Sequence, residues 1–360
     1  MLKKKIFTPG PTQVHPDVLK ATISFDTYHR SSEFRDFHKK LNSKLKNIFK
    51  TSQYLNILTT SGTGALETAV INFCKPGDNV LFINQGRFGA RWGTICKAHN
   101  LNAVELHIDY GKCAEIADLE SVNFTNIAVV FLTHTETSTA TLTDIKKLTE
   151  YIKSKTNALI IVDAVTSVGA IEFRMDDWNI DVAVSASQKG LMTQPGIAII
   201  AYSEKAKNIM MDNPMPRYFF DLRKELKSFE EDGLSMWTPA VGIFYGVDKA
   251  CDIIMERGLE NQWKATHEMA EYFRSTSIDN GFGLFSSSPS DSLTALTMPD
   301  GIPSGKLIKA MQYKYGTHIA NGQAEMKDKI ARFSHMGDLE LDDFKELCKL
   351  LTTELKNLQS

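Results

Sequence analysis

The sequence has no long apolar run and no excess of charge of either sign. No stretch of its 360 residues approaches the ~18 to 20 consecutive apolar residues that cross a bilayer. With 41 Lys and Arg against 43 Asp and Glu, the net charge is −2. Lys3, Lys4 and Lys5 are followed by Pro and Gly where a signal peptide has its apolar core. We therefore expect a cytoplasmic protein that binds neither nucleic acid nor a membrane.

Cysteine is scarce and shows no metal-binding spacing. The cysteines are Cys74, Cys96, Cys113, Cys251 and Cys348. An odd number without a Cys-x-x-Cys pair fits neither a disulfide framework nor a zinc site. We therefore expect reduced thiols and no bound metal. The composition, 42% hydrophobic and 23% charged, is that of a globular protein, and the length is typical of about two domains.

Short apolar runs alternate with helical patterns over the first two thirds of the chain. The runs lie at 57–58 with their flanks, 80–83, 104–108, 127–132, 158–162, 182–184 and 197–201. Together with helical segments such as 65–73 and 143–153, they predict an α/β fold with a mainly parallel, seven-stranded sheet covered on both faces. The connection 189–196 is too short for a helical crossover, so we expect the strand at 197–201 to be antiparallel.

The pattern changes after residue 242. Helical patterns at 242–257 and 260–275 precede short alternating strands near 282–285, 292–298 and 330–334, and a last helical pattern covers 342–358. This order predicts a smaller C-terminal α+β domain. Proline and glycine at 8–12 interrupt regular structure and predict an extended arm. The predicted division is an arm over 1–20, a large domain over 21–241 and a small domain over 242–360.

Polar clusters follow several of the predicted strands, where parallel sheets bind their ligands. Ser61, Gly62 and Thr63 stand at a strand-to-helix turn, whose free backbone N–H groups suit a phosphate. Asp163 ends a buried strand and would need a cationic partner there. Lys189 also follows a strand, and burial would make its amine nucleophilic.

Each cluster taken alone is more often structural: a turn, a loop cap or a surface lysine. A phosphate-suited turn, a lone carboxylate and a lysine at one edge of a sheet are, however, what pyridoxal phosphate requires. A fourth cluster, His-Thr-Glu-Thr-Ser-Thr at 134–139, also follows a strand, and its hydroxyls suit a phosphate or a ring oxygen. The combination indicates a site for this cofactor.

The order of these motifs along the chain carries a family resemblance. The motifs are TPGPT at 8–12, SGTGALE at 61–67, GRFG at 86–89, HTETST at 134–139, DAVTS at 163–167, SQKG at 187–190, PG at 195–196, TP at 238–239 and ARF at 331–333. The chain resembles the class V pyridoxal-phosphate aminotransferases, the alanine–glyoxylate, serine–glyoxylate and serine–pyruvate group. The resemblance covers nearly the whole length and implies the aspartate-aminotransferase fold, fold type I.

The resemblance also implies roles for individual residues. Lys189 would be the Schiff-base lysine and Asp163 the partner of the pyridine nitrogen. The remaining cofactor residues would be Ser61, Gly62, Thr63 and Gln188 at the phosphate, Val165 and Phe88 on the two ring faces, and Thr137 near the ring hydroxyl. Thr238 would reach the phosphate of a neighbouring subunit in a homodimer, although Ser235 stands where many relatives have a tyrosine. Arg332 would bind the substrate α-carboxylate.

The implied activity is a ping-pong transfer of an amino group from a small amino acid, such as alanine, serine or aspartate, to a 2-oxo acid, such as glyoxylate or pyruvate. A 2-aminoethylphosphonate–pyruvate transaminase is an alternative, in which the cations near Tyr28-His29-Arg30 would meet a second anionic group; otherwise this segment is an ordinary polar loop. A cysteine desulfurase or lyase is disfavoured, because Gln188 precedes the lysine and no cysteine lies between Cys251 and Cys348. Further alternatives are a non-catalytic binding protein of this fold and a nicotinamide dehydrogenase, whose fingerprint Glu67 interrupts.

Overall fold

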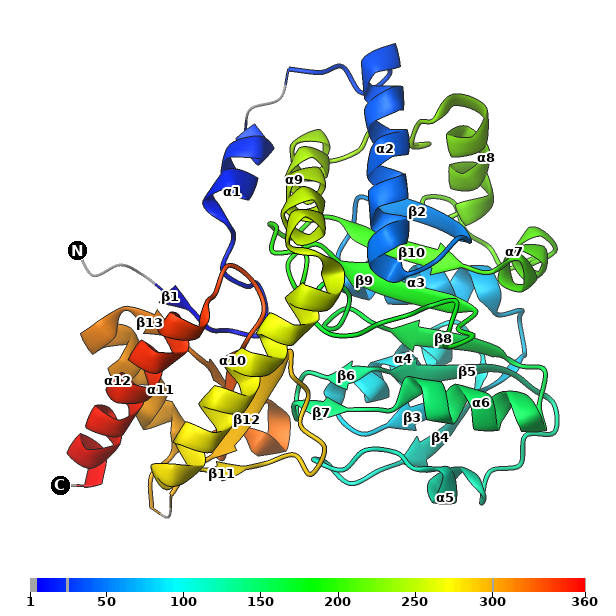
Figure 1. Ribbon diagram of the computed structural model, residues 1–360. Coiled ribbons are helices and arrows are strands. Elements are labelled where there is room, and N and C mark those ends of the chain that lie inside the picture. Colours follow the sequence, from blue (N-terminus) through cyan, green and yellow to red (C-terminus); the bar gives the residue numbers. More distant parts are fainter. Residues whose placement is uncertain (1–4, 24–25, 300, 360) are drawn as a thin grey trace.

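A mixed sheet with helices on both faces forms the larger part of the computed structural model, which describes residues 5–23, 26–299 and 301–359 (Figure 1). Within those residues the sheet has seven strands in the order β2-β10-β9-β8-β5-β3-β4. The strands are β2 (Tyr54–Leu58), β3 (Asn79–Asn84), β4 (Asn102–His107), β5 (Ile127–Thr133), β8 (Leu159–Asp163), β9 (Val182–Ala186) and β10 (Ala198–Tyr202). Each of the seven predicted runs forms one of these strands, which confirms the predicted sheet.

The direction of β10 is also confirmed. It pairs antiparallel with both of its neighbours, β2 and β9, whereas the other neighbouring pairs of the sheet are parallel. The parallel strands β2, β3, β5, β8 and β9 therefore end at one edge of the sheet. The polar clusters that follow these strands meet at this edge.

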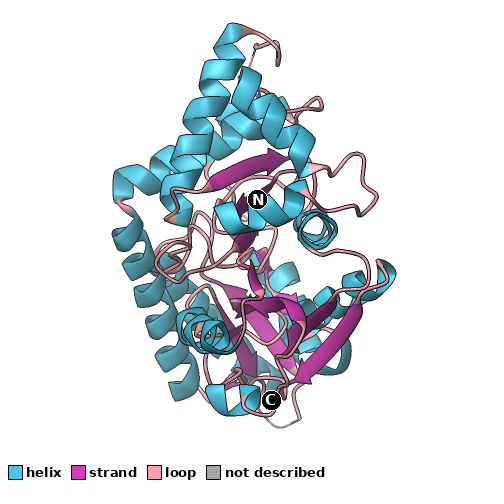
Figure 2. Cartoon of the chain, turned by 90° about the vertical axis from the view of Figure 1, so that its right-hand side faces the viewer, coloured by secondary structure: helices cyan, strands magenta, loops and turns pink. Residues whose placement is uncertain are grey.

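Helices cover both faces of the large sheet, as Figure 2 shows. On one face lie α2 (Ser32–Phe49), α6 (Ile145–Lys155) and α9 (Val241–Arg257), and on the other α3 (Gly62–Phe73), α4 (Arg87–Ala98), α7 (Glu204–Met211) and α8 (Leu222–Asp232). Strand side chains alternate between the faces, so Ile160 and Val162 join the first core and Leu159 and Ile161 the second. Burial on both faces explains why the strands are continuously apolar.

A smaller sheet lies beside the large one. Its order is β11-β12-β15-β14, and its paired strands are antiparallel. Its elements are β11 (Gly283–Leu284), β12 (Leu293–Thr297), β14 (Ala320–Asn321), β15 (Ile330–Ser334), α10 (Leu259–Asp279), α11 (Ser304–Tyr315) and α12 (Leu341–Gln359). Phe273, Phe333 and Phe344 from α10, β15 and α12 share one buried core. This confirms the predicted smaller α+β part.

The N-terminal segment connects the two sheets. β1 (Lys5–Ile6) pairs in parallel with β13 (Thr317–His318), and Phe7 is buried in the small core. α1 (Pro16–Ile23) begins inside the predicted arm and packs on α9, whose buried residues belong to the core of the large sheet. The predicted boundaries at 20/21 and 241/242 stay predictions. The remaining short elements are α5 (Ile116–Leu119), β6 (Thr135–Glu136), β7 (Thr141–Leu142) and a 3-10 turn (Ala324–Met326).

Candidate active site

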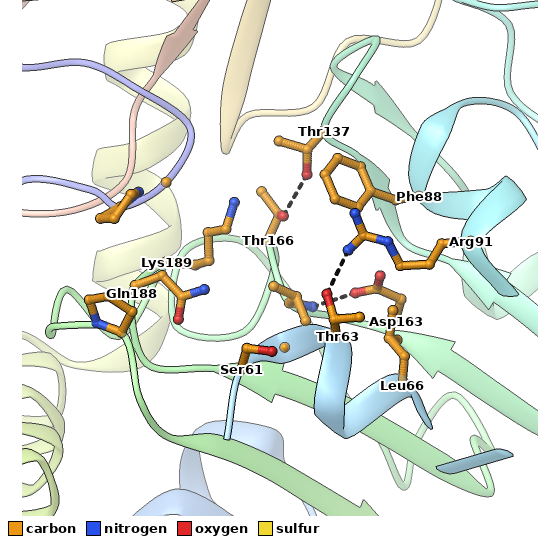
Figure 3. Close-up of a pocket in the computed structure, with 15 residues that line it drawn as sticks. Ser61, Thr63, Leu66, Phe88, Arg91, Thr137, Asp163, Thr166, Gln188 and Lys189 are labelled. Carbon is orange, nitrogen blue, oxygen red and sulfur yellow. Dashed lines mark hydrogen bonds between the residues drawn. The ribbon is translucent and has the colours of Figure 1, made fainter. Parts of the chain in front are cut away.

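A cavity of about 310 Å³ opens where the parallel strands end (Figure 3). Nine residues that the sequence singles out line it: Ser61, Gly62, Thr63, Phe88, Thr137, Asp163, Val165, Gln188 and Lys189. The lining also includes Gly10, Pro11, Leu66, Thr166 and Pro195, which lie in the motifs quoted above, and Arg91, which lies in none of them. The structure therefore brings these predicted groups to one place, although they come from segments far apart in the chain.

Lys189 lies in the loop between β9 and β10, with its amine in the cavity. The Nζ atom donates a hydrogen bond to the carbonyl oxygen of Pro9 at 2.6 Å. Burial lowers the pKa of Lys189 to about 8, and the negative charge of Asp163 partly opposes this effect. A substantial fraction of the amine is therefore neutral near pH 8 and can act as a nucleophile or a base.

Gly10, in the segment 8–12, packs against the side chain of Lys189. Thr12 binds the lysine loop through its backbone N–H, which donates to the carbonyl oxygen of Gln188 at 3.1 Å. Gly10 has φ +152°, and a Cβ atom there would lie 2.5 Å from Nζ of Lys189. Only glycine leaves room for the lysine side chain at this point. The predicted arm thus forms one wall of the cavity.

Asp163 is the last residue of β8 and is buried. Its Oδ1 accepts a hydrogen bond from the backbone N–H of Val165 at 3.0 Å. Burial raises the pKa of Asp163 to about 6, while the charges of Arg91 and Lys189 lower it in part. Because Asp163 forms no direct ion pair among the described residues, this carboxylate is available to a cationic group of a ligand.

The N-terminus of α3 points into the same cavity. Ser61 is its N-cap, and the Ser61 Oγ accepts from the N–H of Gly64 at 3.2 Å. The backbone N–H groups of Gly62 and Thr63, in the first turn, have no partner within the helix. The side-chain oxygen of Gln188 is buried and without a hydrogen-bond partner among the described residues. The N–H groups of Gly62 and Thr63 form a cradle that suits an anion, and the NH₂ group of Gln188, which also lines the cavity, is a further donor.

Arg91 is a cation of the cavity that the sequence reasoning missed. Its guanidinium carbon lies 4.6 Å from the ring centroid of Phe88, and its Nη1 donates to Oγ1 of Thr63 at 3.0 Å (Figure 3). The signal in the sequence is spacing: residues three apart on a helix share a face, so Arg91 follows Phe88 on α4. Two threonines of the cavity lining, Thr137 and Thr166, are joined through their hydroxyl groups at 2.7 Å (Figure 3).

Arg332 lies on β15 of the small sheet, next to the cavity lining rather than in it. Its Nη1 donates to the carbonyl oxygen of Thr137 at 2.9 Å, and its Nε and Nη2 donate to that of Asn321 at 3.0 and 2.8 Å. Burial lowers the pKa of Arg332 to about 10, so the group stays cationic at neutral pH. Backbone carbonyls fix the guanidinium while leaving N–H groups for a carboxylate.

Thr238 is a second predicted site residue, besides Arg332, that does not line the cavity. It is exposed, and it lines a separate hollow with Ser235 and Trp237. Exposed Tyr218, Phe219 and Met236 lie in the neighbouring segments, and the ring of Phe219 stacks on that of Trp237. Within one chain, Thr238 therefore lines a different hollow from the one that contains Lys189.

A membrane-spanning helix is not found among the described residues, since none of their helices combines the necessary length and apolarity. All five cysteines are unpaired, and none of them lines the cavity among the residues described.

Known proteins are similar to this chain in both sequence and fold. The family model for aminotransferase class-V matches residues 6–298. An L-aspartate–glyoxylate aminotransferase of Paracoccus denitrificans is 33% identical over 97% of this chain and 90% of its own length. A serine–glyoxylate aminotransferase of Hyphomicrobium methylovorum is 32% identical over 93% of this chain and 85% of its own. The structure of a subgroup IV aspartate aminotransferase from Thermus thermophilus superposes with a TM-score of 0.92 and 30% identity, over 98% of this chain and 99% of its own. The chain therefore belongs to the class V aminotransferases, enzymes whose family implies pyridoxal phosphate.

Proposed function

We propose that this enzyme uses pyridoxal phosphate to move the amino group of a small amino acid to a 2-oxo acid such as glyoxylate or pyruvate. The observation that carries the proposal is the shared cavity of the Lys189 amine, the Asp163 carboxylate and the N-terminus of α3. Alanine, serine and aspartate are the amino donors we expect, and relatives named for aspartate–glyoxylate and serine–glyoxylate transfer support this range.

The residues of the cavity fit pyridoxal phosphate. The first-turn N–H groups of α3 and the amide of Gln188 would hold its phosphate, and Asp163 would face its ring nitrogen. Val165 and Phe88 would pack on the ring, and Thr137 would lie near the ring hydroxyl. When bound, the cofactor supplies an aldehyde that captures amines and a ring that withdraws electrons from the substrate α-carbon.

The chain's own groups account for the rest of the chemistry. Burial gives Lys189 an amine that is partly neutral near pH 8, so it can take the proton from the α-carbon of a bound amino acid. The Asp163 carboxylate would keep the ring nitrogen opposite it protonated, because loss of that proton would leave the buried carboxylate without a cationic partner. Amino donor and oxo-acid acceptor use one site in turn, so we expect ping-pong kinetics.

Arg332→Lys is expected to weaken binding of the α-carboxylate. Lysine cannot provide the planar, two-point contact of the guanidinium, so kcat/KM for amino acids should fall about 10- to 100-fold, the equivalent of one charge-assisted hydrogen bond. Steady-state kinetics with several amino donors measure this effect. Arg274→Lys is the matched control, because Arg274 is also buried and donates to a carbonyl oxygen, that of Ser290. Arg332 donates to Thr137, which lines the cavity, whereas Ser290 does not line it. Equal kcat/KM values for both variants and the wild type would remove Arg332 from the substrate site.

Half-reaction spectroscopy tests the function directly. Purified enzyme with pyridoxal phosphate is mixed with one amino compound at a time, without an acceptor, and the visible absorption is followed. Alanine, serine or aspartate should convert the spectrum to that of the pyridoxamine form, and glyoxylate or pyruvate should restore it. Conversion by 2-aminoethylphosphonate alone would support the phosphonate alternative, and no conversion by any amine would contradict transamination.

The positions of the cysteines argue against a desulfurase. That reaction needs a thiol near the substrate, but Cys251 and Cys348 are buried in α9 and α12. Burial raises the pKa of the Cys348 thiol to about 11, which disfavours its thiolate at neutral pH. Formation of alanine from cysteine, with release of sulfide once a thiol reductant is added, would reopen this alternative.

We also propose a homodimer in which Thr238 contacts the cofactor phosphate of the neighbouring subunit. The exposed hydroxyl of Thr238 beside exposed Tyr218 and Phe219 supports an interface at this surface. Thr238→Ala should raise the dissociation constant of pyridoxal phosphate about 10-fold by loss of one hydrogen bond to a charged group. Thr353→Ala, at an exposed threonine of α12, is the control. A monomer in sedimentation at assay concentration would contradict this proposal. The cytoplasmic location stays a prediction.

A further inference from the structure

Glu136 is a buried carboxylate that none of the roles above uses. It lies in β6, inside the cluster 134–139, and has no exposed surface. Its Oε2 accepts from the backbone N–H groups of Phe88 and Gly89 at 3.0 and 2.9 Å, and its Oε1 accepts from that of Ser138 at 3.0 Å. The hydroxyl of Ser138 is a further donor to Oε1. Both oxygens thus accept backbone N–H groups, an arrangement that only a carboxylate satisfies fully.

These contacts fix the start of α4. The N-cap residue of α4 is Gly86, which offers no side-chain cap, so Glu136 supplies from another segment what a serine or aspartate would supply locally. Its negative charge at the helix N-terminus is also favourable. The fit is close, because a Cβ atom on Gly86 would lie 2.5 Å from the carboxyl carbon of Glu136. The helix position, and with it the position of Phe88, therefore depends on this carboxylate.

The position and the charge of Glu136 also affect Arg332. The next residue, Thr137, accepts a hydrogen bond from Nη1 of Arg332, and the charge of Glu136 partly opposes the effect of burial on the pKa of Arg332. The carboxylate of Glu136 thus contacts the helix that carries Phe88, and Glu136 directly precedes Thr137, whose carbonyl group holds Arg332. Glu136 is thus linked both to Phe88, which would pack on the cofactor ring, and to Arg332, which would bind the substrate carboxylate.

We propose that Glu136 is a positioning residue: it sets Phe88 against the cofactor ring and Arg332 against the substrate carboxylate, without touching either molecule. This inference rests on the proposed function, which assigns those two partners. Loss of the carboxylate should therefore change the orientation of the bound cofactor and the KM for the amino donor together. A purely structural role would change stability alone.

Glu136→Gln tests the proposal in the full-length enzyme loaded with pyridoxal phosphate. The carboxamide keeps the shape but turns an NH₂ group toward a backbone N–H, which should release the start of α4. We expect altered visible circular dichroism of the bound cofactor and a fall in kcat/KM of about 10²-fold, the effect of a misplacement near 1 Å. Most of that fall should lie in KM. Without cofactor, the amides of residues 86–91 should exchange hydrogen faster than in the wild type.

Glu354→Gln is the matched control, because Glu354 is equally buried but pairs with Lys314 in the small domain. It should lower the melting temperature with no change in the circular dichroism or KM. If Glu136→Gln does not fold, Ser138→Ala replaces it. This variant keeps the carboxylate but removes the hydroxyl that donates to Glu136 and accepts from the backbone N–H of Arg87, so it should give a smaller change in the same direction. Wild-type dichroism and KM in the folded variant, next to an active wild type, would overturn this inference. An inactive wild type would instead contradict the proposed function.

Discussion

Lys189→Ala is expected to lower kcat/KM by about 10⁴-fold, the upper range for loss of a general base. Alanine removes the amine that lies in the cavity and that burial keeps partly neutral near pH 8. The variant should also lose the covalent, yellow form of the cofactor. Steady-state kinetics measure the first effect. Borohydride reduction followed by mass spectrometry measures the second. It should attach the cofactor to the Lys189 peptide of the wild type and leave the corresponding peptide of the variant unmodified.

Lys205→Ala is the matched control for this experiment. Lys205 also has a pKa lowered by burial and donates to a backbone carbonyl, that of Asn157 at 2.7 Å, but it lies on α7 outside the cavity. Its replacement should leave activity and the cofactor spectrum unchanged. Normal transamination by Lys189→Ala, or reduction of the cofactor onto another lysine, would contradict the assignment of Lys189.

Asp163→Asn is expected to lower kcat by about 10²- to 10³-fold, the range for removal of one preorganised electrostatic group. Asparagine keeps the size of the side chain and can still accept the hydrogen bond from Val165. It carries no charge, however, so it cannot hold a protonated ring nitrogen opposite it. The amine of Lys189 stays in place, and the cofactor should therefore still bind covalently. Kinetics and visible absorption together measure this separation of binding from turnover.

Asp181→Asn controls for the loss of a buried carboxylate in general. Asp181 is buried and directly precedes β9, at the amino-terminal end of the strand and away from the strand ends that form the cavity. Its Oδ2 accepts a hydrogen bond from the backbone N–H of Ile160 at 2.9 Å. That variant should lose stability but keep its kcat per folded molecule. A cofactor analogue methylated on the ring nitrogen carries a permanent positive charge and should restore part of the activity of Asp163→Asn. Full activity of Asp163→Asn with the ordinary cofactor would refute the role of Asp163.

The sequence was informative about the sheet because burial acts on each strand separately. A strand that is buried on both faces must be apolar along its whole length, and this property can be read from a short window such as 158–162. The direction of β10 followed from a connection too short for a crossover. Lys189 and Asp163 were predicted because each directly follows such a strand, and the edge of a parallel sheet brings strand ends together.

The contacts that the sequence alone did not predict join segments that lie far apart in the chain. The carbonyl of Pro9 meets an amine 180 residues later, and Arg332 meets the carbonyl of Thr137 at a separation of 195 residues. Glu136 caps a helix that begins 49 residues before it (136 − 87 = 49), so no local capping pattern marks its function. Helix spacing indicates that Arg91 shares a face with Phe88, but not which cavity that face meets.

By itself, the sequence therefore determined which segments form the sheet, which polar groups end at its edge and which family the motifs resemble. Only the tertiary structure decided how the two sheets and the N-terminal segment meet around Lys189, that Arg91 lines the cavity, that Glu136 caps α4, and that Thr238 lines a separate hollow. The physical reason is that burial and periodicity act within a few residues, whereas contacts between distant segments depend on how all the elements pack together.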